Sequence, residues 1–250
     1  MKVTIITVCY NRVETIEKAL LSVLQQSHSN IEYIVIDGQS TDGTQEILEQ
    51  YSPKLAHYIC EPDNGMYDAL NKGLALASGD IIGLVHSDDE LYDNNVITRI
   101  VEKFNDNLDI EAVYGDGIYV SNSNPSQVIR NRIGGAFSIK KIKSGWLPLH
   151  PTFYIKRSEV ERLGYYNLNY RIASDTDFLL RYLYHNRTRV AYLNLYIIRM
   201  RLGGMSTSKS RAIEVLIEDY KIYRSFGLSA LKAVFQKKSR AALQYIQSKF

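Results

Sequence analysis

The N-terminal part of the chain alternates between short apolar runs and longer stretches in which apolar residues recur every three or four positions. The short runs are rich in Val and Ile, which predicts strands buried on both faces. The longer stretches have the spacing of helices with one apolar face. The expected strands cover residues 3–8, 31–36, 56–60 and 81–85, and the expected helices cover 13–26, 44–51, 67–77 and 94–104.

Strands and helices that alternate at this spacing predict an α/β fold: a Rossmann-like, mostly parallel sheet flanked by helices. The second half of the chain is less regular. It predicts short strands at 113–114 and 118–120, a polar loop at 121–127, helices at 137–143 and 174–184, a strand at 190–200 and a flexible break at 203–206. We therefore expect a domain over residues 1–206, followed by a C-terminal helical extension over 207–250.

Carboxylates gather where the predicted strands end. Asp37 ends the second strand, and the adjacent Asp88 and Asp89 follow the fourth. Ligands bind beyond the carboxyl ends of parallel strands, and carboxylate oxygens suit Mg²⁺ or Mn²⁺. Adjacent side chains at a strand end point to opposite sides, so one of the pair can take a metal while its neighbour holds a ribose. The alternative is structural, because acidic residues also favour the start of a helix, and Asp37 could equally cap its own turn.

Two further acidic residues open the helix expected over 174–184. Asp175 and Asp177 lie about 200° apart around a helix, so only one of them can face a cleft. Asp177 has Arg181 four residues later, which is the pattern of an exposed ion pair. Asp175 shares the inward stripe with Leu179 and Tyr182, and is the better candidate for a partly desolvated general base. A purely structural acid at a helix start is the alternative.

His150 precedes a proline in a loop, where it could contact a phosphate or an acceptor hydroxyl, or could simply be packed.

The sequence also excludes several classes of protein. No HExxH, GxGxxG, Walker or GxSxG pattern is present, which argues against a zinc hydrolase, a dehydrogenase, a P-loop NTPase and an α/β-hydrolase. The net charge is only +3, from 30 basic and 27 acidic residues, which argues against a nucleic-acid-binding protein.

No apolar stretch is long enough to cross a bilayer, and the N-terminal run is too short for a signal peptide. The two cysteines, Cys9 and Cys60, form no CxxC pattern and argue against a disulfide scaffold. We therefore expect a cytoplasmic protein.

Taken together, the segments along the chain resemble glycosyltransferase family 2, which has the GT-A fold, and more closely its bacterial polysaccharide branch of colanic-acid-type transferases. The resemblance covers about residues 1–206. It rests on TIITVCYN at 4–11, IVIDGQSTDGT at 34–44, EPDNGMYDALNKG at 61–73, SGD at 78–80, SDD at 87–89, ASDTD at 173–177 and GGMS at 203–206.

This resemblance implies an inverting transfer of a sugar from a nucleoside-diphosphate sugar, with UDP the commonest nucleotide. In this family Val8 and Tyr10 would lie against the base, with Asn11 beside them. Asp37 would bond the base edge, and Asp68 would line the nucleotide pocket. The first half of the domain, to about residue 110, would bind the nucleotide, and the second half, 111–206, the acceptor.

The resemblance further implies that Asp88 and Asp89 are the DxD-like element, with Asp89 toward a Mn²⁺ or Mg²⁺ ion. Asp175 matches the position of the family's general base, and residues 203–206 would belong to a loop that closes over the donor. The chain departs from the family at His86, where Asn is common; this histidine could touch metal or phosphate. It also reads Ser174-Asp175 where relatives have Glu-Asp, so the choice between Asp175 and Asp177 stays open.

The C-terminal extension has five basic residues and no acidic residue after Phe226. It is consistent with a basic amphipathic helix on an anionic membrane surface, which would suit a lipid-linked acceptor, or with a helix packed on the catalytic domain. The acceptor is expected to be a saccharide or a lipid-linked molecule. Two other classes remain: a sugar nucleotidyltransferase, whose Gly-rich phosphate loop is absent here, and an inactive carbohydrate-binding protein, which would have lost its carboxylates.

Overall fold

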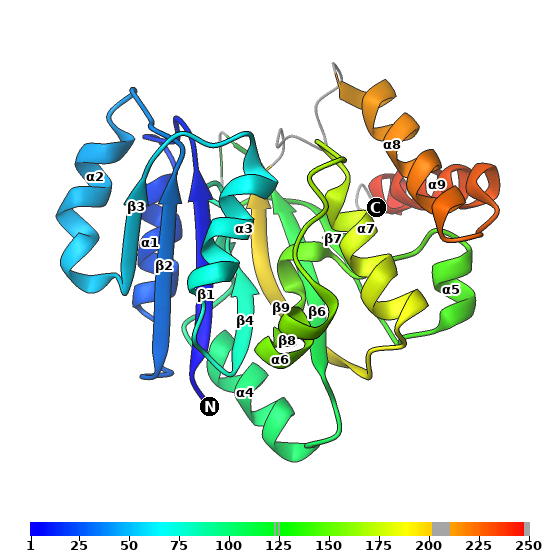
Figure 1. Ribbon diagram of the computed structural model, residues 1–250, viewed down its shortest axis with the longest axis horizontal. Coiled ribbons are helices and arrows are strands. Elements are labelled where there is room, and N and C mark those ends of the chain that lie inside the picture. The colour runs from blue at the N-terminus through cyan, green and yellow to red at the C-terminus, as the bar shows by residue number, and fades with distance from the viewer. Residues whose placement is uncertain (123, 125, 202–210, 248–250) are drawn as a thin grey trace.

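A computed structural model describes residues 1–122, 124, 126–201 and 211–247 of the chain, and side chains as far as Arg240. The described residues form one nine-stranded sheet with the strand order β3-β2-β1-β4-β8-β6-β9-β5, and β7 pairs with β6 outside this path (Figure 1). The strands are β1 (Val3–Cys9), β2 (Ile31–Asp37), β3 (His57–Cys60), β4 (Ile81–Leu84), β5 (Glu90–Leu91), β6 (Ala112–Val120), β7 (Val128–Arg132), β8 (Tyr154–Lys156) and β9 (Val190–Arg201).

The first four strands are parallel, as the alternating pattern predicts. β1 pairs with both β2 and β4, and β2 pairs with β3. Successive side chains of β1 enter opposite faces of the sheet: Ile6 packs toward one set of helices and Ile5 toward the other, each at most 1% exposed. A strand buried on both faces needs apolar residues at nearly every position, which explains its continuous apolar run.

The second half of the sheet is mixed in direction. β8 runs antiparallel to both β4 and β6, while β6 and β9 are parallel. The α/β class is confirmed, but the parallel arrangement holds only for β1–β4 and for the pair of β6 with β9. The two strands expected around Gly115-Asp116-Gly117 are a single strand, β6, with register shifts against β9 at this point. Glycine is required at 115 because a Cβ there would lie 2.8 Å from the Leu195 carbonyl oxygen.

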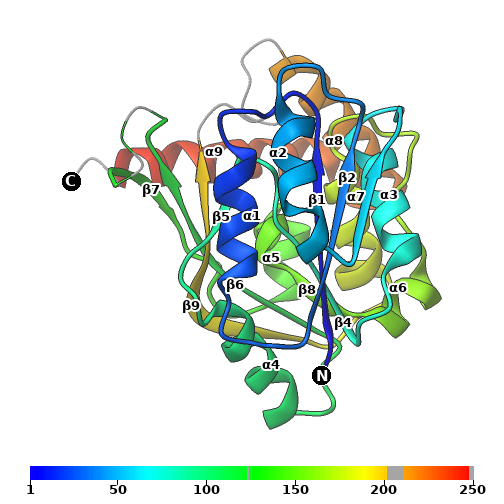
Figure 2. The same cartoon turned by 90° about the vertical axis from the view of Figure 1, so that its left-hand side faces the viewer.

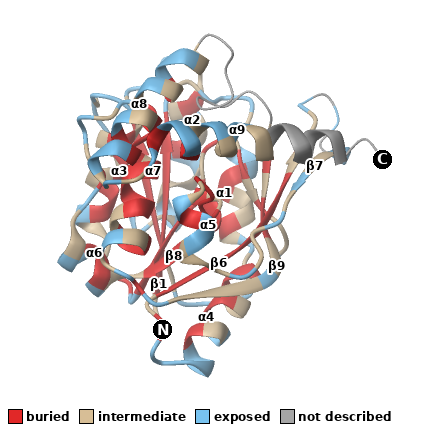
Figure 3. Cartoon of the chain, turned by 90° about the vertical axis from the view of Figure 1, so that its right-hand side faces the viewer, coloured by how far each residue is buried: buried red, intermediate tan, exposed pale blue. Residues whose placement is uncertain are grey.

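The helices cover both faces of the sheet (Figures 1 and 2). One face packs against α1 (Ile16–Leu24), α2 (Thr44–Tyr51) and α4 (Val96–Asp106). The other face, whose apolar core appears as buried residues in Figure 3, packs against α3 (Met66–Leu76), α5 (Ile139–Lys143), α6 (Arg157–Leu163), α7 (Ser174–Leu179), the π-helix η3 (Leu180–His185), α8 (Ala212–Ser225) and α9 (Ala230–Gln247). Short 3₁₀ turns occur at η1 (Ser52–Lys54) and η2 (His150–Thr152).

Helix α1 begins at Ile16, later than the expected residue 13. The backbone N–H groups of Arg12 and Val13 donate instead to side chains of Thr44 and Asp42, at 2.8 and 3.1 Å. These bonds tie the loop after β1 to the start of α2. The loop that follows β1 is therefore held open, at the edge of the sheet where parallel-sheet ligands bind.

Helices α8 and α9 pack on the core rather than extending from it. Ile222, Tyr223 and Ala233 are fully buried. The backbone of α9 passes so close to Gly145 that a Cβ at that position would overlap the Ala233 carbonyl. Within the described residues, no helix combines the length and the apolar character that crossing a bilayer requires. The break expected at 203–206 lies outside the described residues.

Candidate active site

A cavity of about 1000 Å³ opens at the carboxyl ends of β1 and β4 and continues toward β7, α7 and the C-terminal helices. A cavity of this size can hold a nucleotide and a second group. Among the expected site residues, those that line it are Val8, Tyr10, Asn11, His86, Asp88, Asp89, His150 and Asp175. Asp37 and Asp68 are not among the lining residues.

The end of β1 forms one wall of the cavity. Asn11 adopts a left-handed backbone conformation with φ of 53°, which asparagine tolerates better than most residues. Its N–H donates to Ser40 Oγ, and its side-chain oxygen accepts the N–H of Thr41, both at 2.8 Å. Tyr10 is 59% exposed, so its ring offers a free flat face. This wall is suited to stacking a planar ring.

Asp37 lies beneath this wall and is fully buried. Its carboxylate accepts the Ser40 N–H at 2.9 Å and the thiols of Cys9 and Cys60 at 3.4 and 3.3 Å. Burial, followed by the Asp37 charge and hydrogen bond, raises the pKa of both thiols, so both stay protonated and donate. In this arrangement Asp37 organises the turn after β2.

The loop between β3 and α3 supplies a carboxylate, Asp63, to which sequence reasoning gave no role. Asp63 lines the cavity, accepts the Gly65 N–H at 2.7 Å and packs against Gly38 so closely that a Cβ there would overlap its carboxylate. Asp68 instead accepts the Asn64 N–H at 2.9 Å, in the first turn of α3. Asp63 is therefore the acidic group that this loop presents to the cavity.

Asp88 and Asp89 follow β4 at the centre of the cavity wall. Asp89 is buried, and this burial, together with the Asp88 charge, raises the pKa of its carboxyl group well above the ordinary value, although the backbone N–H of Arg201 works in the opposite direction. A buried carboxyl group whose pKa is raised by a neighbouring carboxylate forms a site where a cation would favour the charged form.

No three His, Cys, Asp or Glu side chains converge into a complete metal site within the described part of the chain. The carboxylates of Asp88 and Asp89 fit a hard divalent cation that takes its remaining ligands from water and from a bound diphosphate, as Mg²⁺ and Mn²⁺ do.

Asp175 projects into the cavity from the first turn of α7. Its Oδ1 accepts the Thr176 N–H at 2.8 Å and lies 3.4 Å from the Tyr67 hydroxyl, which is itself 2.8 Å from the Ile172 carbonyl. The other carboxylate oxygen accepts no hydrogen bond from a protein donor among those of the described residues. Asp175 therefore keeps an acceptor available for a proton.

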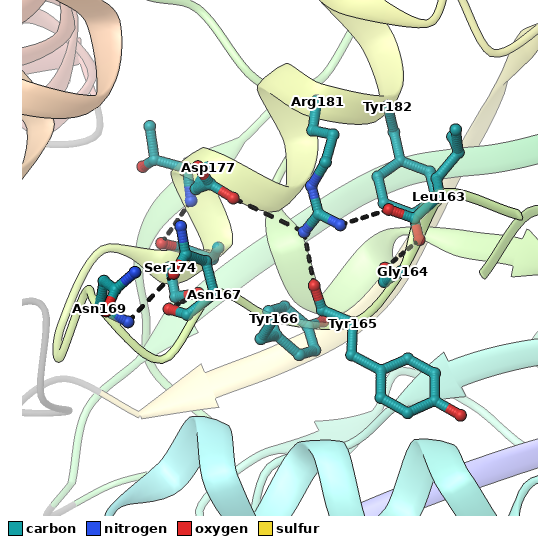
Figure 4. Close-up of polar contacts among 12 residues, drawn as sticks. Leu163, Gly164, Tyr165, Tyr166, Asn167, Asn169, Ser174, Asp177, Arg181 and Tyr182 are labelled. Carbon is teal, nitrogen blue, oxygen red and sulfur yellow. Dashed lines mark hydrogen bonds and ion pairs between the residues drawn. The ribbon is translucent and has the colours of Figure 1, made fainter. Parts of the chain in front are cut away.

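Asp177, two residues later, has a structural role (Figure 4). The expected ion pair with Arg181 is present, at 3.6 Å. The expectation that it is exposed is wrong: Asp177 is only 8% exposed, and burial raises the pKa of its carboxyl group. Arg181 also donates to the carbonyls of Leu163 and Tyr165, so this pair clamps the loop that packs against α7. Because Asp177 is absent from the cavity lining, Asp175 is the candidate base.

His150 and His86 lie side by side in the cavity wall, with ring centroids 6.0 Å apart. His150 Nε2 is 2.7 Å from the Tyr166 hydroxyl. Burial, with a smaller contribution from His86, lowers the pKa of His150 to about 3, and burial also lowers that of His86. Both imidazoles are therefore neutral near pH 7, and His86 faces the charges of Asp88 and Asp175.

The C-terminal helices hold the segment that carries Asp175. Glu218 on α8 accepts the backbone N–H groups of Arg171, Ile172 and Ala173, at 2.9, 2.9 and 2.8 Å. These three groups immediately precede α7. Sequence reasoning missed this anchor, because nothing in the local pattern around Glu218 indicates a partner more than 40 residues away.

A second anchor joins α7, α8 and α9. Asp219 is fully buried and pairs with Lys237 at 2.8 Å, and the Thr176 hydroxyl donates to the same carboxylate at 3.1 Å. Burial would lower the pKa of Lys237, but Asp219 outweighs it and raises the pKa. The residue next to Asp175 is thus hydrogen-bonded to the C-terminal helical pair, which becomes part of the site's framework.

The sheet order, the acidic residues after β4 and the base candidate on α7 together define a GT-A glycosyltransferase fold. The profile of the family described as Glycosyl transferase family 2 matches residues 4–173, more than half of the chain. The protein belongs to glycosyltransferase family 2. An uncharacterized glycosyltransferase of Mycobacterium tuberculosis is 33% identical over 183 residues, which cover 72% of this chain and 68% of that protein.

A PGL/p-HBAD biosynthesis glycosyltransferase of Mycobacterium bovis is 28% identical over 209 residues, covering 82% of this chain and 79% of that protein. Among solved structures, S. aureus TarS 1–349 in complex with UDP-GlcNAc superposes with a TM-score of 0.69 at 19% identity, over 89% of this chain and 65% of that one. This chain therefore spans less than two thirds of that TarS chain. The mannosyltransferase PcManGT from Pyrobaculum calidifontis, in complex with GDP-Man and Mn²⁺, gives a TM-score of 0.65 at 18% identity, over 96% and 73%.

Proposed function

We propose that this protein is an inverting glycosyltransferase that moves a sugar, in the first instance a hexose, from a nucleoside-diphosphate donor to a saccharide or lipid-linked acceptor in the synthesis of a cell-surface polysaccharide. One observation carries the proposal: Asp88 and Asp89 share a single cavity with Asp175, which projects from a different element. An inactive binding protein would not need this second carboxylate, and the family's established chemistry does.

The donor would occupy the side of the cavity formed by β1. The nucleobase of the donor would stack on Tyr10 beside Val8 and Asn11. Asp37 would act from beneath this wall by holding the turn that carries Gly38. UDP is the nucleotide we expect; the UDP-GlcNAc bound to TarS supports this expectation, and the GDP-Man bound to PcManGT makes GDP the main alternative. Asp68 would act on the pocket indirectly, through the first turn of α3.

The diphosphate would lie near Asp88 and Asp89, which we propose to hold Mn²⁺ or Mg²⁺, with Asp89 as the direct ligand. When bound, the cation neutralises charge on the diphosphate as it departs. The Mn²⁺ in the PcManGT complex supports divalent-metal use in this fold. His86, which lines the cavity with Asp88 and Asp175, is suited to donate a hydrogen bond to a phosphate or acceptor oxygen from its neutral ring.

In the transfer step, Asp175 would accept the proton of an acceptor hydroxyl as that oxygen bonds to the anomeric carbon. The bond from that carbon to the donor's phosphate oxygen would break, and its electron pair would leave with the nucleoside diphosphate. Attack on the face opposite the leaving group inverts the anomeric configuration. Tyr67, which contacts Asp175 and is buried, would keep the carboxylate aimed at the acceptor.

The test measures release of free nucleoside diphosphate from UDP-, GDP- and dTDP-sugars with and without Mn²⁺. Asp89→Ala should abolish metal-dependent release. Asp175→Asn should lower it about 10²–10⁴-fold while leaving donor binding intact, because it removes only the base. Asp109→Asn, at an exposed position that does not line the cavity, is the matched control and should behave as wild type. Full activity of either variant would refute the assignment of that residue.

We also propose that the C-terminal helices touch an anionic membrane surface at the cytoplasmic face. Part of this segment follows the alternative of a helix packed on the domain, because Lys237 and Arg240 turn inward, onto Asp219 and Ser144. Leu231 and Phe235 are nonetheless 75% and 73% exposed, and Lys232 between them is exposed. Stronger sedimentation with phosphatidylglycerol vesicles than with phosphatidylcholine vesicles, lost in a Leu231→Ser/Phe235→Ser double variant, would support this; equal sedimentation would refute it.

A further inference from the structure

Part of the cavity is lined by arginines to which the proposed function gives no role. Arg130 and Arg132 line it from β7, and Arg240 lines it from α9. Helix α9 lies against β7 (Figures 2 and 3), although more than 100 residues separate the two elements. All three arginines therefore line the same cavity. This set of three residues is called the arginine cluster below.

The two arginines of β7 are held on one face of the strand. They are two residues apart, and their partners across the ladder are Tyr119 and Gly117 of β6. The Arg130 guanidinium stacks over the Tyr119 ring at 4.7 Å. Its Nε is buried and, within the described part of the chain, has no hydrogen-bond partner. A buried donor without an acceptor is costly, and an anion in the cavity would satisfy it.

The third arginine reaches the cluster from the C-terminal helix. Arg240 donates to the hydroxyl of Ser144 at 3.1 Å and also to its carbonyl. Burial lowers the pKa of Arg240 and of Arg132, and for Arg132 the nearby charges of Arg130 and Arg240 lower it further. No carboxylate of the described side chains forms an ion pair with Arg130 or Arg240. The fold thus holds the guanidinium groups of the cluster near one another although they repel each other.

The arginine cluster and the nucleoside wall belong to different parts of the sheet. The nucleoside wall is formed by β1 and β2, whereas β7 pairs with β6, beyond β4 and β8 in the order of the sheet. Asp88 and Asp89 follow β4, which lies between these two parts in that order, and Asp175 lines the same cavity from α7. The arginines therefore lie away from the place of the nucleoside, in a cavity that also presents Asp175.

We propose that the arginine cluster binds a phosphoryl group of the acceptor, so that this enzyme glycosylates a phosphorylated or diphosphate-linked molecule. This inference rests on the proposed function, because it assigns the acceptor side of the same cavity. Guanidinium groups bind phosphate through paired N–H donors, and three of them around one cavity suit a dianion. A neutral saccharide would bring no negative charge to the buried Nε of Arg130.

The first test does not depend on catalysis. Inorganic phosphate is titrated into the protein by calorimetry in the presence of EDTA, so that no metal can bring phosphate to the aspartates. Arg130→Gln and Arg240→Gln should each weaken phosphate binding about tenfold or more, since each removes a charge-assisted contact. Arg130→Lys, which keeps the charge but loses the paired donors, should fall between the wild type and Arg130→Gln.

Arg99→Gln is the matched control. Arg99 lies on α4, pairs with Asp93 and does not line the cavity, so its loss should leave phosphate binding unchanged. Circular dichroism and thermal melting check that each variant is folded. Absence of phosphate binding by the wild type, or equal binding by the folded Gln variants, would overturn the proposal.

The second test distinguishes the two sources of such a phosphoryl group. Glucose 6-phosphate and geranyl diphosphate are added to metal-dependent donor hydrolysis, with glucose and geraniol as neutral controls and Mn²⁺ in excess. Inhibition that is not competitive with the donor, and that weakens about tenfold in Arg240→Gln, supports the proposal. Stronger inhibition by geranyl diphosphate indicates a lipid diphosphate, and stronger inhibition by glucose 6-phosphate a phosphorylated saccharide. No difference between the phosphorylated and neutral compounds would contradict it.

The two proposals can fail separately. If the wild type hydrolyses no donor, the proposed function fails, and phosphate binding by the arginine cluster is still decided by calorimetry. If donor hydrolysis is normal and phosphate binding is indifferent to the arginines, the acceptor inference alone is wrong.

Discussion

The donor side and the acceptor side of the cavity are built in different ways. On the donor side, the ends of two neighbouring strands hold each other: Asn11, after β1, bonds the turn at Ser40, and Asp37, at the end of β2, bonds the same serine three residues later. On the acceptor side, Asp175 depends on Glu218, which is more than 40 residues away, and on the pair of Asp219 with Lys237. The comparison suggests that the donor site is stable by itself, whereas the geometry of the base depends on the C-terminal helices.

The largest effect is expected on the acceptor side, from a substitution of Lys237. Lys237→Met leaves the fully buried carboxylate of Asp219 without its ion-pair partner, which should lower the free energy of unfolding by about 3–5 kcal/mol. Chemical denaturation measures this loss. The neighbouring Lys238, which is exposed, is the matched control, and Lys238→Met should change the free energy by less than about 0.5 kcal/mol.

Adding Asp219→Asn to Lys237→Met should restore part of the lost stability, because the uncompensated charge is then gone. If the single Lys237 variant is as stable as wild type, the ion pair does not anchor α9 and the comparison loses its main support.

A milder change loosens the segment that carries the general base, Asp175. Glu218→Gln removes the charge that accepts three backbone N–H groups before α7, which should destabilise the protein by about 1–3 kcal/mol. The turnover number should fall while the affinity for the donor stays the same, since only the segment that carries Asp175 is loosened. Steady-state kinetics and donor titration measure the two effects.

Glu214 lies one turn earlier on α8 and is exposed, so Glu214→Gln is the control for the change of residue type. A Glu218 variant that weakens donor binding as much as turnover would show that the two sides of the cavity are coupled.

The smallest expected effect is at the start of β2, the end of the strand opposite to the donor side, as a pH dependence of stability. Burial alone would raise the pKa of Glu32, but hydrogen bonds from Lys2, Ser78 and Thr4 outweigh it and lower the pKa to about 2. Because the folded form binds its proton less readily than the unfolded form, this group stabilises the fold above about pH 4.5, and the contribution is lost as the pH falls toward 2.

After allowance for screening by solvent, the contribution is about 1–2 kcal/mol. Urea denaturation between pH 2 and 6 should show a steeper acid loss of stability for the wild type than for Glu32→Gln. Glu49→Gln, at an exposed position on α2, should keep the wild-type slope. Parallel curves for wild type and Glu32→Gln would show that this network contributes nothing.

The strands and helices of the first half could be predicted because their apolar patterns are long and regular. The elements that were missed, β5, β7, β8 and α6, are two to seven residues long and carry too few periods to recognise. The helix-face argument placed Asp175 toward the cavity, where the structure has it. It misjudged Asp177 because α7 is covered on its other side too, by the loop that Arg181 clamps.

The arginine cluster shows the limit of local reasoning most clearly. The sequence around Arg130 and Arg132 did not predict a strand, and Arg240 was expected only as one charge of a basic helix. Only the packing of α9 against β7 brings them to a common cavity.

By itself, the sequence determined the α/β order of the first half, the family and the acidic residues at the strand ends, since apolar period and turn chemistry act over a few residues. The tertiary structure decided which acid is clamped and which is free, how the C-terminal helices support the base, and where positive charge collects. Those outcomes depend on contacts between segments far apart in the chain, and burial and electrostatic neighbours exist only once those segments have packed.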